Sequence, residues 1–215
     1  MNNSPYVLKP ASVQSVMLRV LVALLPGIAV YVWFFGAAVL VQIALASVTA
    51  LVAEAVMLRL RGKPLMLFLS DGSALVTAWL IALTFPSIAP WWLTVLGTLL
   101  AIVVAKHLYG GLGQNPFNPA MVAFALMIVA YPLLMSQWPK VDTTDFAGQW
   151  EAIFGSRQIL DAMTMATPLD ALRTVLRDPE QRAMIGGILG GKATFGNVGG
   201  RGWEWIAAGY FIGGL

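Results

Sequence analysis

The sequence predicts an all-α protein: a polytopic bundle of transmembrane helices, some of them interrupted, with one long extracytoplasmic loop. Of its 215 residues, 59% are hydrophobic and only 11% are charged, whereas soluble domains carry about 25% charged residues. The apolar residues gather in long runs that lack the polar stripe of a soluble helix. These runs also lack the alternation of a β-strand. Together, the three observations predict helices that lie in lipid.

Six apolar runs follow one another along the chain, and each is expected to form all or part of a membrane helix. They cover residues 20–35, 37–58, 74–85, 91–105, 120–135 and 206–215. The second run is long enough to span a bilayer by itself. The third run is short and ends at Pro86, and the last stops in mid-span without a closing charge. We therefore expect the sequence to be part of a longer chain.

The positive charges predict the orientation of these helices. The N-terminal segment, the Arg59–Lys63 turn and Lys106 are basic, so the positive-inside rule places these helix ends in the cytoplasm. The turns at Phe35–Gly36 and Ser87–Pro90 carry no positive charge and are expected outside. We expect five transmembrane helices in residues 1–135, the extracytoplasmic loop in residues 136–202, and the start of a further transmembrane helix in residues 203–215.

The composition also limits the chemistry of the chain. It has no cysteine and a single histidine, His107, so it cannot ligate an iron–sulfur cluster through cysteine or hold a haem between two of its own histidines. The net charge of +3 indicates anchoring at the cytoplasmic face, and we expect no nucleic-acid partner, metal site or bond-making catalytic residue. If the chain carries electrons, it needs an organic cofactor.

A glycine- and proline-rich segment near residues 110–120 is expected to form a re-entrant loop between helices. It reads Gly-Gly-Leu-Gly-Gln-Asn-Pro-Phe-Asn-Pro-Ala; glycine permits left-handed turns and proline removes a backbone donor. Irregular backbone at membrane depth needs shelter from protein or a cavity, and interrupted helices often bind ions or ligands. Asn115 and Asn118 suit a polar ring edge such as that of a flavin, but a structural turn explains the same spacing.

A second motif, residues 161–168, lies in the polar segment and reads Asp-Ala-Met-Thr-Met-Ala-Thr-Pro. Its Thr167 precedes a proline that can open a helix. Judged from the residues alone, the favoured interpretation is a helix N-cap at Thr167 with Asp170 in the first turn. An amphipathic helix is expected over residues 168–176, followed by a glycine-rich stretch over residues 186–202.

Three further ionisable residues lie in or beside the apolar runs. Glu54 is a candidate ion ligand, because an intramembrane carboxylate is a functional hypothesis by default, but an interfacial pair with Arg59 is the favoured interpretation. Asp71 is expected to cap the following helix. His107 is expected at the membrane interface beside Lys106.

Resemblance to a known family decides between these interpretations. Asp161, Thr164, Ala166 and Thr167 match Asp-x-x-Ser/Thr-x-Ala-Thr. This pattern is similar to the flavinylation signature of membrane redox complexes, in which FMN is joined through its phosphate to the last threonine. With these residues the chain resembles the RnfD/NqrB family, found in Rnf complexes and in the sodium-pumping NADH:quinone oxidoreductase. The similarity also includes residues 26–29, 89–92, 108–120 and 166–170.

The resemblance implies that Thr167 carries FMN as a phosphoester. It also implies that Asp161 and Thr164 are recognised by the flavin transferase or shape the site, and that Asn115 and Asn118 hold a non-covalent riboflavin. Met165 departs from the glycine or other small residue that many flavinylation motifs have at that position.

The same resemblance implies a membrane electron-transfer subunit of an Rnf-type ferredoxin:NAD oxidoreductase, which couples electron flow to the movement of Na+ or H+. Its expected location is a bacterial inner membrane, with the flavin-bearing loop on the periplasmic side. Its expected partners are the bilayer and other subunits of the complex, including a second flavinylated subunit. The alternative is a secondary transporter or channel subunit with a binding site at its broken helices.

Overall fold

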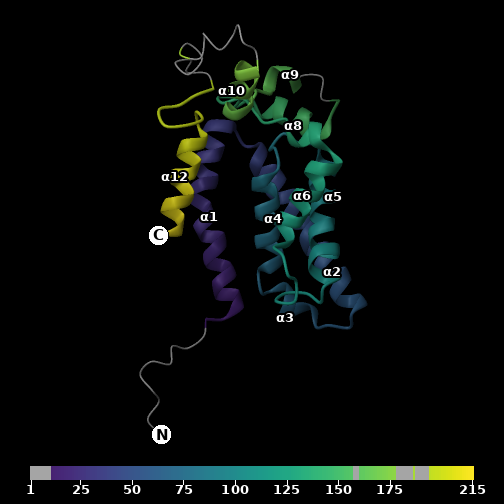
Figure 1. Ribbon diagram of the computed structural model, residues 1–215. Helices are drawn as coiled ribbons and strands as arrows, with labels where there is room; N and C mark the ends of the chain where they lie inside the picture. The colour runs from purple at the N-terminus through teal and green to yellow at the C-terminus, as the bar shows by residue number, and fades with distance from the viewer. Residues whose placement is uncertain (1–10, 157–159, 178–185, 187–193) are drawn as a thin grey trace, which may run out of the picture.

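A computed structural model describes residues 11–156, 160–177, 186 and 194–215 of the chain (Figure 1). These residues form helices and, apart from two isolated bridges, no β-structure, which confirms the predicted all-α class. The helices of the central bundle are α1 (Val13–Phe35), α2 (Ala38–Leu60), α4 (Ser73–Thr84), α5 (Trp91–Leu99), η1 (Leu100–His107) and α6 (Pro119–Ala130). The remaining helices are α3 (Leu65–Leu69), α7 (Pro132–Met135), α8 (Phe146–Phe154), α9 (Leu160–Met163), α10 (Pro168–Arg177) and α12 (Trp203–Gly214).

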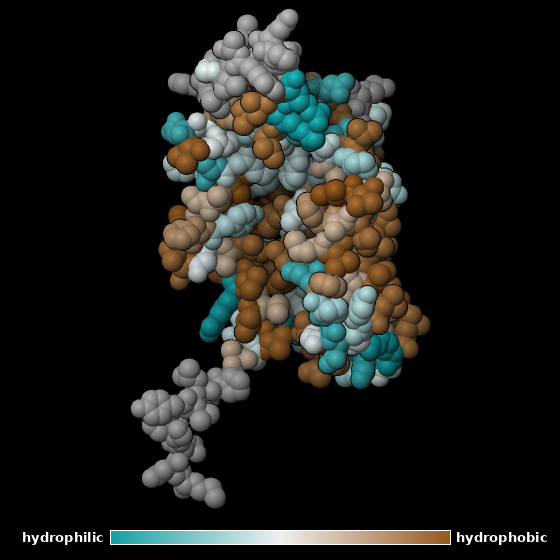
Figure 2. All heavy atoms as spheres, viewed as in Figure 1, coloured by the Kyte–Doolittle hydropathy of each residue, from teal (hydrophilic) through white to brown (hydrophobic). Residues whose placement is uncertain are grey.

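The bundle has the surface of a membrane protein. Among the described residues, α1 and α2 are each 23 residues long and apolar enough to cross a bilayer. A core helix of a soluble protein would be mostly buried. In the most apolar 18-residue stretch of each helix, only 17% of α1 and 33% of α2 is buried. Figure 2 shows hydrophobic side chains over the middle of the bundle and hydrophilic ones toward both ends. Lipid is the solvent that this distribution fits, because soluble proteins rarely expose large continuous apolar patches.

The two ends of the bundle differ in what they carry (Figure 1). One end carries α8, α9 and α10 and is called the loop end below. The other end carries α3 and the turn with Arg59, Arg61 and Lys63, and is called the basic end. α1 and α2 meet at the loop end through Gly36, whose φ of +83° favours glycine.

Two helix starts show how local polar groups set the boundaries. α1 begins at Val13, well before its apolar run, because the Ser12 hydroxyl accepts the N–H of Ser15 at 3.2 Å. In the turn before α4, the Asp71 carboxylate accepts the N–H of Ser73 at 2.7 Å, but the N-cap predicted at Asp71 is one residue too early. The cap position itself is occupied by Gly72.

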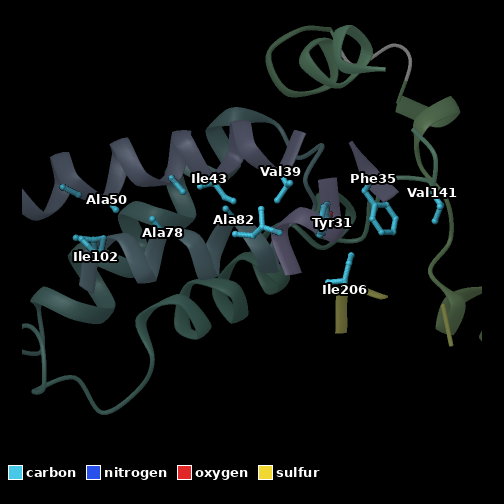
Figure 3. Packing of buried hydrophobic residues seen from close by; sticks show 14 residues of the cluster. Tyr31, Phe35, Val39, Ile43, Ala50, Ala78, Ala82, Ile102, Val141 and Ile206 are labelled. Atoms are coloured by element: carbon cyan, nitrogen blue, oxygen red, sulfur yellow. The ribbon is translucent and has the colours of Figure 1, made fainter. Parts of the chain in front are cut away.

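Small residues let the central helices approach closely. The buried cluster between α2 and α4 is rich in alanine, and Figure 3 shows several of its members. These alanines are Ala46, Ala50 and Ala53 of α2, and Ala74, Ala78 and Ala82 of α4. Because apolar burial does not drive helix association in lipid, close backbone approach and van der Waals packing stabilise this contact.

α12 also packs closely along α1, through small residues, although in the sequence the polar segment separates α12 from the other helices of the bundle (Figure 1). A Cβ at Gly209 would lie 3.0 Å from the Cα of Gly27, and one at Gly213 would collide with the carbonyl oxygen of Ala23. The two backbones are therefore in direct contact, and α12 returns from the loop end into the bundle.

The polar segment is fastened to the bundle by Gln149 of α8. Its buried amide Nε2 donates to the carbonyl oxygens of Phe35, at 2.8 Å, and Thr143. Its Oε1 accepts the N–H of Ala38 at 2.8 Å. The amphipathic helix predicted over 168–176 is observed as α10. Of the predicted glycine-rich stretch, residues 187–193 lie outside the described residues.

Candidate functional site

The motif that ends at Thr167 lies at the loop end and is held by an antiparallel backbone contact. The N–H of Lys140 donates to Met163 at 2.7 Å, and the N–H of Met165 donates to Trp138 at 3.2 Å. An isolated bridge joins Pro139 to Thr164 between these two bonds. This short pairing fixes the motif relative to residues 138–140.

Thr167 occupies the N-terminal boundary of α10. Its Oγ1 accepts the N–H of Asp170 at 3.3 Å and donates to the Asp170 carboxylate at 3.0 Å. The capping interpretation drawn from the residues is therefore observed. The side chain is half-buried, while Asp170 is exposed.

Thr167 also lines an open cavity of about 400 Å³ at the surface of the loop end. The other lining residues are Trp138, Pro168, Leu169, Gly200 and Trp203. The volume lies within the usual range of ligand pockets, about 300–1,000 Å³. Asp161 is exposed on α9 and Thr164 is half-buried in the bridge, and neither lines this cavity. Of the three predicted residues in the motif, only Thr167 reaches it.

The walls of this cavity fit a flat aromatic group tethered at Thr167. The indoles of Trp138 and Trp203 meet at nearly a right angle, 83°, with ring centroids 5.2 Å apart. A Cβ at Gly200 would lie 2.6 Å from Pro168 Cγ and 3.1 Å from Trp203 Cδ1. The absence of a side chain at Gly200 thus keeps α10 and the start of α12 close together beside the cavity.

The second candidate pair, Asn115 and Asn118, lies at the basic end. Both line a cavity of about 240 Å³ together with Lys106, Ser73 and other residues from several helices. The Nδ2 of Asn115 donates to the carbonyl of Phe117 at 2.7 Å, and the Oδ1 of Asn118 accepts the N–H of Ala120 at 2.9 Å as the cap of α6. Both side chains thus also make the structural turn that was the alternative interpretation.

The geometry of this second site fits part of a flavin only. The cavity is smaller than the usual ligand pocket of about 300 Å³ or more, so the described residues accommodate one edge of a ring system. Gly110, Gly111 and Gly113 have φ of +112°, +102° and +81°, as the predicted left-handed turns require. The segment connects η1 to α6, and its re-entry into a bilayer stays a prediction.

Comparison with known proteins gives a family assignment. The family model for NQR2, RnfD and RnfE matches residues 1–215. The chain belongs to the NQR2, RnfD, RnfE family. Two relatives are each named as the D subunit of an ion-translocating oxidoreductase complex: that of Aeromonas salmonicida is 44% identical over 99% of this chain, and that of Yersinia pestis is 41% identical over 99%. The chain spans 64% of the length of both relatives.

This member of the NQR2, RnfD, RnfE family buries an ion pair inside the bundle. Lys106 Nζ donates to Glu54 Oε1 and Oε2 at 2.8 and 2.9 Å, and to Ser73 Oγ at 2.9 Å. The side chains of Glu54 and Lys106 are each only 3% exposed. The predicted interfacial pair of Glu54 with Arg59 is therefore wrong: Glu54 faces η1, and Arg59 is exposed.

His107 belongs to the same buried cluster, so its predicted interfacial position is also wrong. Its Nε2 lies 3.1 Å from Glu54 Oε2, and its Nδ1 lies 3.3 Å from Arg61 Nη1. Because a guanidinium can only donate, Nδ1 is the acceptor in its contact with Arg61. The buried Nε2 lies close to Glu54 but makes no hydrogen bond of good geometry. The π-helical turn of η1 presents Lys106 and His107, consecutive in sequence, to one carboxylate; such turns are frequent at functional sites.

Several residues of these sites were not among the predicted ones. Trp138 and Trp203 lie near the two ends of the polar segment. Their positions there were the only feature of the sequence that could have indicated a role at the site. The partnership of Glu54 with Lys106 has no local signal, since 52 positions separate them. Within the described residues, no group of three His, Cys, Asp or Glu side chains is placed to hold a metal ion.

Proposed function

We propose that this chain is a membrane electron-transfer subunit of an Rnf-type ion-translocating oxidoreductase complex, and that it carries FMN covalently at Thr167. The two relatives above carry the name of a component of an ion-translocating oxidoreductase complex. The observation that carries the proposal is the place of Thr167, where the threonine that ends a flavinylation-type motif lines a cavity between two tryptophans.

The residues around Thr167 suit a phosphoester. The phosphate would sit at the N-terminus of α10, where backbone N–H groups and the helix dipole favour negative charge. The flavin would supply the electron transfer, and the chain would supply binding and orientation. Esterification removes the hydroxyl proton that now bonds to Asp170. Because like charges repel, the exposed Asp170 carboxylate would turn toward solvent.

The proposal includes a second flavin and a complex around it. A riboflavin would bind with one edge at Asn115 and Asn118. Electrons would pass between ferredoxin and NAD through partner subunits, one of them also flavinylated, and would drive Na+ or H+ across a bacterial inner membrane. The loop end would face the periplasm. Solvent extraction of the purified protein should then release a flavin that lacks phosphate.

The attachment site is tested with a Thr167→Ala variant on a denaturing gel. The full chain, made in a host that has the flavin transferase, should give a fluorescent band that this variant lacks. Thr174→Ala is the matched control, because Thr174 is also on α10 and is exposed. A Thr167→Ala band as bright as the wild-type band would show that the attachment residue is another one.

The competing function is that of a secondary transporter or channel subunit. The observation that favours it is the buried Glu54–Lys106–His107 cluster beside an interrupted helix, since intramembrane charges mark ion pathways. A wild-type chain without any flavin, covalent or extractable, would support this alternative against the proposal.

A further inference from the structure

We propose that Trp138 and Trp203 are the two walls that hold the isoalloxazine ring of the flavin at Thr167, with the ring stacked on one indole and edge-on to the other. This inference rests on the proposed function, because it concerns the ring of that same flavin. Nothing in the motif itself assigns a role to either tryptophan.

Both tryptophans are fixed relative to the attachment residue. The carbonyl of Trp138 accepts the N–H of Met165, two residues before Thr167. Trp203 begins α12, directly after Gly202, whose φ is +81°. Both side chains and Thr167 line the same cavity. A ring tethered at Thr167 therefore meets these indoles without a rearrangement of the backbone.

The packing behind Trp203 keeps that wall in place. Its ring lies with centroid distances of 4.8 Å to Phe35 and 6.0 Å to Tyr31, and both of these residues are buried in the bundle. Trp138 contacts Trp203 edge-on at 5.2 Å. Both indoles are half-buried and line the cavity, and Trp203 is supported from behind by the buried rings of Phe35 and Tyr31.

The right angle between the indoles suits a single flat ring. Aromatic rings prefer offset stacking or edge-to-face contact over a face-to-face sandwich. A corner of two perpendicular indoles offers one contact of each kind to the same guest. The cavity volume of about 400 Å³ admits a ring system of this size, and apolar Leu169 and Pro168 complete the lining.

Flavin fluorescence lifetime reports directly on this stacking, because an indole in contact with an excited flavin quenches it by electron transfer. The emission of the Thr167→Ala variant, which lacks the covalent flavin, is subtracted first. The remaining emission of the full chain should then have a dominant short lifetime. In Trp203→Leu or Trp138→Leu, the ratio of stacked to unstacked flavin should fall about two- to tenfold.

The controls separate a ring wall from a general packing role. Trp205→Leu removes an exposed indole two residues along α12, outside the cavity, and should leave the lifetimes unchanged. Trp203→Phe and Trp138→Phe keep an aromatic ring for folding but remove the electron-donating indole, so the short component should shrink in them too. The denaturing gel should show as much covalent flavin in every tryptophan variant as in the wild type.

Two results have different meanings. A wild-type chain without a fluorescent band on the denaturing gel would overturn the proposed function, and this inference with it. A normal band, combined with lifetimes that do not change in any variant of Trp138 and Trp203, would overturn only the stacking inference.

Discussion

Gln149 shows how a single side chain joins the polar segment to the membrane helices. It is fully buried, and its amide bonds to three backbone groups: the carbonyls of Phe35 and Thr143 and the N–H of Ala38. Two of these groups belong to the turn between α1 and α2, which Gly36 makes possible. A Cβ at Gly36 would collide with the Gln149 amide, so the turn and the amide fit each other.

We expect Gln149→Glu to destabilise the protein, although the side chain keeps its size. A carboxylate retains the acceptor for Ala38 but loses both donors, which leaves the carbonyls of Phe35 and Thr143 unsatisfied. Each unsatisfied buried group costs about 1–3 kcal/mol. Unfolding in detergent measures the change in free energy. Gln14→Glu, at an exposed position of α1, is the control, and equal stability of the two variants would contradict the role of the Gln149 amide.

At the scale of elements, α12 depends on glycine to reach α1. The contact brings Gly209 against the backbone of Gly27, so there is no room for a larger side chain. α12 also carries Trp203 at its first turn. The position of one wall of the loop-end cavity is therefore set by a helix–helix contact inside the bundle.

Gly209→Leu should push α12 away from α1 and lower the stability by about 1–3 kcal/mol, the usual effect of overpacking. The thermal unfolding midpoint in detergent measures this effect. Gly214→Leu is the matched control, since a Cβ at Gly214 meets nothing within 4 Å. An unchanged midpoint in Gly209→Leu would mean that the two helices do not need their close contact.

At the scale of the whole molecule, the buried charges join α2, α4 and η1 in one polar cluster. Lys106 reaches Glu54 on α2 and Ser73 on α4. Removal of one partner from a buried ion pair is strongly destabilising because it leaves an uncompensated charge, whereas replacement of both by apolar groups is often tolerated.

Lys106→Met and Glu54→Gln should each cost stability, by about 3–5 kcal/mol where a charge is left unpaired. The double variant should lose less than the sum, with a coupling of about 1–3 kcal/mol in a double-mutant cycle. The exposed pair of Arg201 and Asp142, 2.6 Å apart, is the control, with a coupling of about 0.2–1 kcal/mol. If the effects of Lys106→Met and Glu54→Gln on the free energy of unfolding are additive, the buried pair does not contribute to stability.

Helix positions were predictable from the sequence, and long-range partners were not. The apolar runs and Pro86 locate the membrane helices because lipid imposes length and apolarity on each span separately. The motif draws attention to Thr167. The predicted partner of Glu54 was Arg59, five residues away, whereas the actual partner is Lys106, which belongs to another helix. The corner formed by Trp138 and Trp203 likewise depends on how α12 returns to the bundle.

The distance in sequence between Glu54 and Lys106 has a consequence for biosynthesis. The lysine is translated 52 residues after the glutamate, so α2 is synthesised before its counter-charge. A lone charge in a membrane helix costs about 2.5–3.5 kcal/mol on insertion scales, a cost that the other residues of this apolar helix offset. Insertion of α2 and neutralisation of its carboxylate are thus separate events, and the ion pair forms when η1 docks.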